Sequence, residues 1–352
     1  MQLYLCANCG NRLYFENVAC TRCGASLGFL PTTMRLTTLA PTGDGAWRSI
    51  PDNRVLRQCT NYSAHAVCNW MVENDDPHAF CVACRLNQTI PDLGVQGNLE
   101  LWKTMETEKR RLVYSLLRLG LAVVPRSEDA FGLAFDFLAD TGPSFSERGR
   151  VLTGHHEGLI TINIAEADPT QRERMRERMD EPYRTILGHF RHESGHFYWD
   201  RLIRNSGWLS DFRALFGDDT RDYAQALDWH YHNGPPSDWS TYYVSAYASS
   251  HPWEDWAETW AHYLHILDTL ETAYQYGLHI QPRTGDAPQT EHDFDPYDQP
   301  DFKALIEHWL PLTFALNSLN RSMGHPNAYP FVLSPMAIHK LDFVHNVVRG
   351  AR

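Results

Sequence analysis

The sequence predicts an α+β fold in which small cysteine-rich modules precede a larger domain of mixed sheet and helices. All eight cysteines lie within the first 84 of 352 residues, so two kinds of structure follow one another along the chain. Beyond them, short stretches alternate β-branched and polar residues, whereas longer stretches repeat apolar residues at helical spacing. With 43% hydrophobic and 12% aromatic residues in the whole chain, the later part can build a conventional core.

Two Cys-x-x-Cys pairs form the first module, which we assign to residues 1–30. The pairs are separated by ten residues, a spacing typical of a zinc ribbon with four thiolate ligands. So small a module buries too little apolar surface to fold unaided, and a structural zinc ion would supply much of its folding free energy. Disulfide pairing is the alternative. The predicted ligands are Cys6, Cys9, Cys20 and Cys23.

A looser quartet of cysteines predicts a second zinc module over residues 59–92, where His65 and His78 are alternative ligands. Residues 31–58 are rich in Thr, Gly and Pro, so we expect them to link the two modules. We expect both ions to be structural, although zinc ribbons also bind proteins or nucleic acids. The predicted ligands of the second ion are Cys59, Cys68, Cys81 and Cys84.

The large domain, residues 93–352, is expected to begin with a helix that follows Asn98 and ends near Gly120. Residues 131–138 and 158–165 favour strands, because β-branched apolar residues alternate with polar ones in the second of them. Further helices are expected near 302–319 and 335–348.

The chemistry of the large domain is indicated by His192, Glu193 and His196. Two histidines four residues apart, with a glutamate after the first, form the ligand-plus-base pattern of a zinc hydrolase. On a helix such residues project within about 40° of each other, so both imidazoles reach one ion. The pattern also occurs by chance in unrelated proteins. A catalytic zinc needs a third protein ligand and an open position for water.

Apolar residues recur at helical intervals through this stretch, which is therefore predicted to be a helix. Asp180 is a candidate cap, Pro182 suits a first turn, and Gly207 offers a stop. His192 and its partners then fall on a polar face beside the apolar stripe. Asp200 lies on that face too, where it orients a ligand histidine or pairs with an arginine, Arg204 or Arg201.

A second predicted helix offers the third ligand. Glu254 and Glu258 share one of its faces, so one carboxylate can bind the metal while the other fixes the tautomer of a ligand histidine. Asp255 points about 100° away from Glu254. Ser250 can cap this helix and Pro252 suits its first turn.

Two further groups of residues on this helix have other expected roles. His262 and His265 are alternative ligands, but we favour surface or indirect roles for them. The packed face of the helix is expected to consist of Trp253, Trp256, Trp260 and Tyr263.

A His-Glu-x-x-His helix followed by a helix with Glu-x-x-x-Glu resembles the gluzincins. In that group the first acid of the second motif is the third zinc ligand, which implies Glu254, and we expect Glu258 to orient His192. In gluzincins of the lethal-factor type a tyrosine seven residues before this ligand stabilises the oxyanion. Tyr247 stands at that position, although Tyr242 and Tyr243 are close to it.

The whole arrangement resembles the bacterial zinc-binding metallopeptidases that carry an N-terminal zinc ribbon. The resemblance covers essentially the full length and rests on the stretches CANCG, CTRCGASLGF, CNW, CVACRLNQTIPDL, HESGHFYWD and PWEDWAETWAHYLH. It implies a zincin-like peptidase domain with one catalytic zinc ion, in addition to the two structural ions.

Composition restricts the expected surroundings and partners. The formal charge of −12 disfavours general nucleic-acid binding, although a local patch is compatible with it. The N-terminus lacks a basic segment followed by an apolar one, and no apolar run is long enough to span a bilayer. Together with reduced cysteines, this predicts a cytoplasmic protein.

The sequence therefore predicts a zinc-dependent metallopeptidase in which Glu193 activates the attacking water and Tyr247 stabilises the oxyanion. The expected partners are a protein or peptide substrate and, through the ribbons, a further protein. Two alternatives remain. The first is a zinc-ribbon adaptor whose peptidase-like domain is a scaffold, and the second is a zinc hydrolase of non-peptide amides.

Overall fold

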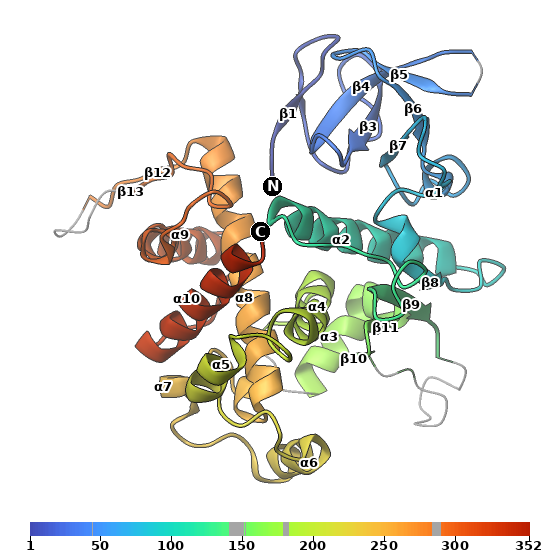
Figure 1. Cartoon of the computed structure of the whole chain (residues 1–352). Coiled ribbons are helices and arrows are strands. Elements are labelled where there is room, and N and C mark those ends of the chain that lie inside the picture. The colour runs from blue at the N-terminus through green and yellow to red at the C-terminus, as the bar shows by residue number, and fades with distance from the viewer. Residues whose placement is uncertain (44, 141–150, 152, 179–182, 284–289) are drawn as a thin grey trace. The chain divides into compact units, whose positions relative to one another are not determined.

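A computed structural model describes residues 1–43, 45–140, 151, 153–178, 183–283 and 290–352. The chain is a mixed helix and sheet protein, as predicted, and it divides into two compact units (Figure 1). The first unit comprises residues 1–118 and 122–179, and the second comprises 119–121 and 180–352. No helix in the described ranges is long and apolar enough to cross a membrane.

The first unit begins with a short hairpin and an antiparallel sheet. The hairpin pairs β1 (Tyr4–Leu5) with β2 (Arg12–Leu13). The sheet has the order β3-β4-β5-β6-β7, and its strands are Ser26–Leu30, Arg35–Pro41, Trp47–Ser49, Val55–Gln58 and Met71–Glu73.

This sheet corrects the expectation that residues 31–58 form a linker, because β4, β5 and β6 lie within that stretch. Leu39 and Leu56 from these strands are buried in one cluster with Leu30 and Met71. The stretch therefore belongs to a core that joins the two cysteine-rich regions, and its content of Thr and Pro concealed the apolar positions that are buried.

The remainder of the first unit contains a second sheet and the predicted helix α2 (Asn98–Arg118). The sheet has the order β10-β11-β9-β8, and its strands β9 and β11 lie within the two stretches predicted as strands. The elements are α1 (Thr60–Ser63), η1 (Cys84–Leu86), β8 (Asn87–Thr89), β9 (Ala134–Leu138), β10 (Gly154–His156), β11 (Leu159–Asn163), η2 (Ile164–Ala167) and α3 (Pro169–Arg178).

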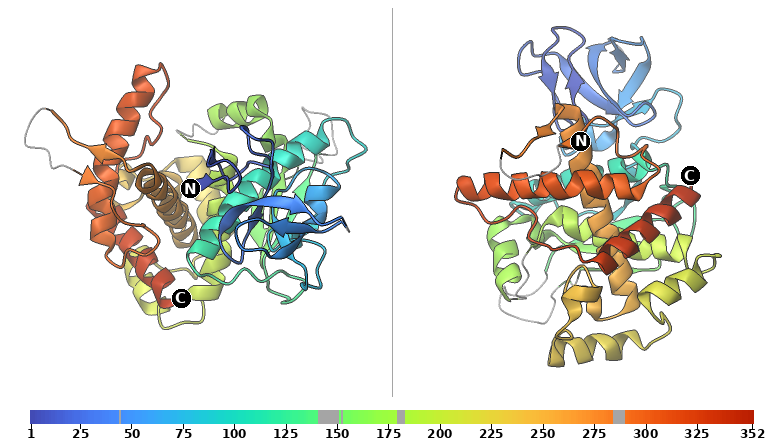
Figure 2. Two further views of the ribbon diagram at one scale, coloured as in Figure 1. Left: turned by 90° about the horizontal axis from the view of Figure 1, so that it is seen from above. Right: turned by 90° about the vertical axis from the view of Figure 1, so that its left-hand side faces the viewer.

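The second unit is mainly helical and is organised around the long helix α8 (Pro252–Tyr276), which packs against α4 (Ile186–Leu202). In the right-hand view of Figure 2, α9 and α10 lie across α8. The other elements are α5 (Leu209–Phe216), α6 (Tyr223–Asn233), α7 (Trp239–Tyr242), η3 (Tyr247–Ser249), β12 (His279–Ile280), β13 (Thr290–Glu291), α9 (Phe302–Ser322) and α10 (Pro335–Gly350).

The caps of α4 and α8 differ from those expected. Thr185 caps α4, since its hydroxyl accepts from the backbone N–H of Gly188 at 3.0 Å. The predicted positions Asp180 and Pro182 lie outside the described residues. His251 caps α8 in place of Ser250, because its Nδ1 accepts from the backbone N–H two residues on at 3.1 Å. An imidazole nitrogen replaces the expected hydroxyl, and Pro252 opens the helix as predicted.

A close approach between α4 and α8 occurs at Gly195. A Cβ atom on this residue would stand 2.9 Å from Cα of Ala257, so only glycine fits without displacement. Two buried indoles of α8 reach the same turn: Trp256 donates to the carbonyl of Gly195 at 2.9 Å, and Trp260 donates to the hydroxyl of Ser194 at 3.1 Å. These contacts place the predicted metal-binding faces of the two helices beside each other.

Candidate metal centres

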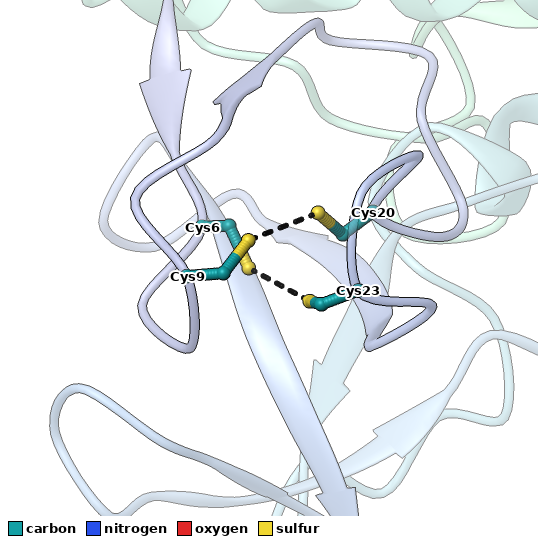
Figure 3. A group of neighbouring side chains, drawn as sticks. All are labelled: Cys6, Cys9, Cys20 and Cys23. Carbon is teal, nitrogen blue, oxygen red and sulfur yellow. Dashed lines mark hydrogen bonds between the residues drawn. The ribbon is translucent and has the colours of Figure 1, made fainter.

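The first four predicted thiolate ligands lie together in the N-terminal module (Figure 3). Cys6 and Cys9 come from one loop, Cys20 and Cys23 from another, and the sulfur atoms point toward a common centre. The Sγ atoms of Cys6 and Cys23 are 3.7 Å apart, and those of Cys9 and Cys20 are 3.6 Å apart. These separations exceed a disulfide bond of about 2.05 Å and suit sulfur atoms around one tetrahedral ion.

Each loop of this module closes in the same way. Gly10 donates to the carbonyl of Cys6 at 2.8 Å, and Gly24 donates to that of Cys20 at 2.9 Å. Both glycines have positive φ, +69° and +71°, where a side chain would be strained. Hydrogen bonds from Asn8 and from the backbone of Ala25 lower the pKa of Cys23 to about 6, which favours the thiolate at this one of the four positions.

The sulfur atoms of the second quartet also lie within 4.8 Å of one another. All four residues are buried free cysteines: Cys59, Cys68, Cys81 and Cys84. Backbone N–H groups point at the sulfur atoms, since Trp70 donates to Cys68 at 3.3 Å and Cys81 donates to Cys59 at 3.4 Å. Such donors stabilise thiolates. The alternative ligands point elsewhere: His65 packs on the ring of Trp102, and His78 lies 3.9 Å from Glu128.

The third cluster consists of His192 and His196 from α4 and Glu254 from the first turn of α8. One ligand atom from each lies within 4.8 Å of the others. Oε2 of Glu254 lies 3.0 Å from Nε2 of His192 and 3.5 Å from Nε2 of His196. Glu254 is 1% exposed, so its carboxylate faces the imidazoles and not solvent.

Glu258 fixes the orientation of His192. Its Oε1 lies 2.7 Å from Nδ1 of the imidazole, and its Oε2 accepts from the hydroxyl of Ser245 at 2.6 Å. A carboxylate only accepts hydrogen bonds, so a neutral His192 carries its proton on Nδ1 and turns the lone pair of Nε2 toward Glu254. The spacing of the two glutamates predicted that one of them would orient a ligand histidine, and His192 was the expected partner of Glu258.

The charges of the cluster fit a cation. Nε2 of His192 and the carboxylate oxygen of Glu254 are both acceptors and lie 3.0 Å apart, so this contact requires a positive charge between them, either a metal ion or, when no ion is bound, a proton on Nε2. Burial lowers the pKa of His192, but the hydrogen bonds with Glu254 and Glu258 outweigh it and raise the pKa well above its usual value. Two imidazoles and one carboxylate are also the ligand set of many catalytic zinc ions.

Glu193 follows the first histidine and is 8% exposed. Burial raises the pKa of its carboxyl group and the charge of Glu254 adds to this rise, while the nearby histidines oppose it. Glu193 is next to His192 in the chain and is not one of the three residues whose ligand atoms converge.

Tyr247 lies at the edge of the cluster, with its ring centroid 6.0 Å from that of His192. The other two tyrosines have different surroundings: Tyr242 is 46% exposed, and the ring of Tyr243 lies 4.3 Å from the ammonium group of Lys340. Of these three tyrosines, therefore, Tyr247 is the one whose ring lies next to a histidine of the cluster.

Sequence reasoning missed the hydroxyls of Ser245 and Tyr223 at this site and assigned Trp253 to another role. The hydroxyl of Tyr223, at the start of α6, donates to Oε1 of Glu254 at 2.6 Å. Trp253 was expected in the packed face of α8, but its ring centroid lies 3.8 Å from that of His196. Trp256 and Trp260 form the packed face as predicted. No periodic pattern connects Tyr223 with Glu254, which is 31 residues away.

Other candidates have different partners. Asp255 accepts from the ammonium group of Lys340 at 2.6 Å, away from the histidines as expected. Asp200 pairs with Arg204 at 2.8 Å, the second of the two expected arrangements. His262 is buried and its Nδ1 lies 2.7 Å from the hydroxyl of Tyr329, so a surface role is wrong for it.

Comparisons with known proteins agree with these clusters. Residues 98–347 match the model of a family described as "Putative zinc-binding metallo-peptidase", and residues 3–95 match a zinc-ribbon domain. Proteins named only as uncharacterized from Mycobacterium bovis and from two strains of Mycobacterium tuberculosis are 44% identical over 350 residues, which cover 99% of this chain and 95% of theirs. No solved structure matches the chain. The chain therefore belongs to this family of zinc-binding metallopeptidases and carries an N-terminal zinc ribbon.

Proposed function

We propose that the protein is a zinc-dependent metallopeptidase of the gluzincin type, with a zincin-like catalytic domain in residues 93–352. One catalytic zinc ion would be held by His192, His196 and Glu254, and two structural ions by the cysteine clusters. The observation that carries this proposal is the convergence of three ligand atoms within 4.8 Å, on a helix in which the buried Glu193 directly follows His192.

Each residue of the site has a different role in hydrolysis. A zinc ion held there would lower the pKa of a bound water molecule and polarise the scissile carbonyl. Glu193, buried and with a raised pKa, accepts the proton of the attacking water and passes it to the leaving nitrogen. Tyr247, which stays protonated because burial raises its pKa, donates to the developing oxyanion.

The orientation of the ligands is set by their hydrogen bonds. Glu258 holds the imidazole of His192 in the tautomer whose Nε2 faces the cluster, and Ser245 holds Glu258 in turn. The absence of such support typically costs metal affinity or activity, so these contacts favour a functional site over a chance arrangement of acids and histidines.

Glu193→Gln tests the assignment of the base. The variant should keep the fold and the catalytic zinc but lose cleavage of a labelled unfolded protein, since Glu193 acts on water and not on the metal. Glu307→Gln, which changes an exposed glutamate of α9, is the control and should cleave at the wild-type rate. A Glu193→Gln chain as active as the wild type would contradict the mechanism.

The wild-type protein distinguishes the remaining alternatives. A chain that binds zinc at His192 and His196 but cleaves neither unfolded protein nor a peptide mixture would favour the adaptor. Hydrolysis restricted to simple non-peptide amides would favour the third alternative, because the site chemistry is the same for either kind of amide.

A further inference from the structure

The carboxylate of Glu254 has different partners on its two oxygens. Oε2 faces the Nε2 atoms of His192 and His196 at 3.0 and 3.5 Å. Oε1 accepts from the hydroxyl of Tyr223 at 2.6 Å. The carboxylate therefore turns Oε2 toward the two histidines, while Oε1 is hydrogen-bonded to the phenol of Tyr223.

Tyr223 is held in place from several sides. It is the first residue of α6, whose cap Asp222 accepts from the backbone N–H of Gln225 at 2.9 Å. The ring of Tyr223 lies 5.3 Å from that of His251, the cap of α8, and 5.5 Å from that of Trp253. These contacts fix the phenol next to the turn of α8 that carries Glu254.

The same contacts reach the second histidine. Trp253 packs its ring 3.8 Å from that of His196, so the start of α6 touches the surroundings of two members of the cluster. Glu254 is almost fully buried, and a buried carboxylate oxygen without a donor carries a desolvation penalty. The hydroxyl of Tyr223 removes that penalty for Oε1 alone and leaves Oε2 for a cation.

We propose that Tyr223 is a positioning residue of the metal centre, which holds Glu254 so that only its Oε2 meets the ion. The helix α6, in the stretch between the two motif helices, then completes the zinc site from outside both motifs. The inference rests on the proposed function only in requiring an ion at His192, His196 and Glu254, and it does not depend on which bond the enzyme cleaves.

Tyr223→Phe tests this role, because it removes the hydroxyl and keeps the ring that packs on His251 and Trp253. The matched control is Tyr276→Phe, which removes the hydroxyl of a tyrosine that is 44% exposed at the other end of α8, about six turns from Glu254. Zinc affinity is measured by competition with a chromophoric chelator after the catalytic ion has been removed and the cysteine-bound ions retained. We expect Tyr223→Phe to weaken zinc binding by about 10 to 100-fold and Tyr276→Phe to leave it unchanged.

A second measurement, the absorption spectrum of bound Co²⁺, reports the position of the Glu254 carboxylate and not the stability of the fold. Co²⁺ added to the emptied site should give a visible absorption spectrum that differs between Tyr223→Phe and the wild type, because Oε1 is released to meet the ion. The control should keep the wild-type spectrum. A Tyr223→Phe chain with the zinc affinity and cobalt spectrum of the wild type would overturn the proposal.

The outcome can be separated from that of the proposed function. If Tyr223→Phe weakens zinc binding while the wild-type chain cleaves no peptide, the positioning role holds and the peptidase proposal fails. If the wild-type chain binds no ion at this cluster, both proposals fail.

Discussion

Nδ1 of His192 lies 2.7 Å from Oε1 of Glu258, whose other oxygen accepts from Ser245 at 2.6 Å. The carboxylate is thus fixed on both sides, and it fixes the imidazole in turn. Because a residue on α8 sets the tautomer of a residue on α4, the cluster depends on the packing between these two helices as much as on the ligands themselves.

Glu258→Ala should weaken zinc binding at the cluster by about 10 to 100-fold, since His192 loses the partner that fixes its tautomer. Chelator competition measures this affinity. Both cysteine clusters should stay filled, because they lie in another part of the chain. Wild-type affinity in this variant would show that the hydrogen bond is incidental.

Gly195→Ala should destabilise the second unit, because the added methyl group meets the backbone of Ala257 at 2.9 Å. Overpacking of this kind costs about 1–3 kcal/mol, and urea unfolding measures the loss. Gly207→Ala is the matched control, since a Cβ at that position meets nothing within 4 Å. Equal midpoints for the two variants would contradict the close approach of α4 and α8.

Asp255→Ala should lower the free energy of unfolding by about 3–5 kcal/mol, because it leaves the buried ammonium group of Lys340 without its carboxylate. The zinc content of the folded chain should not change, since Asp255 is no ligand. The double variant Asp255→Ala/Lys340→Met should recover much of the stability. A double variant as unstable as the single one would show that the charge pair is not the cause.

Chelation should remove the ions in a fixed order. The ion at His192, His196 and Glu254 should leave first, because a catalytic zinc site keeps an open position, whereas four thiolates enclose a structural ion. Zinc retained per chain, measured after increasing times in a mild chelator, should fall from three to two before it falls further. Loss of the cysteine-bound ions first would contradict this order.

Short-range regularities made much of the site predictable. The spacing of His192 and His196 requires a helix, and the spacing of Glu254 and Glu258 places both carboxylates on one face. The two Cys-x-x-Cys pairs likewise specify the first module through local turns that end at Gly10 and Gly24.

Features that depend on contacts between distant segments were not predictable. The hydrogen bond of Tyr223 with Glu254 follows from the path of residues 203–251, for which no periodic pattern exists. The strands within residues 31–58 are stabilised by burial against Leu30 and Met71, whereas their own composition resembles a linker. The cap of α8 is His251 and not the expected Ser250, because an imidazole nitrogen accepts a hydrogen bond from the backbone as a hydroxyl does.

The zinc content of purified Glu254→Ala, compared with that of the wild type and of Asp255→Ala, tests the central claim most directly. We predict three ions in the wild type and in Asp255→Ala, and two in Glu254→Ala, because two histidines and water hold zinc poorly while both cysteine clusters stay filled. A Glu254→Ala chain that retains three ions while Asp255→Ala loses one would contradict the assignment of Glu254 as the third ligand and the peptidase site built on it.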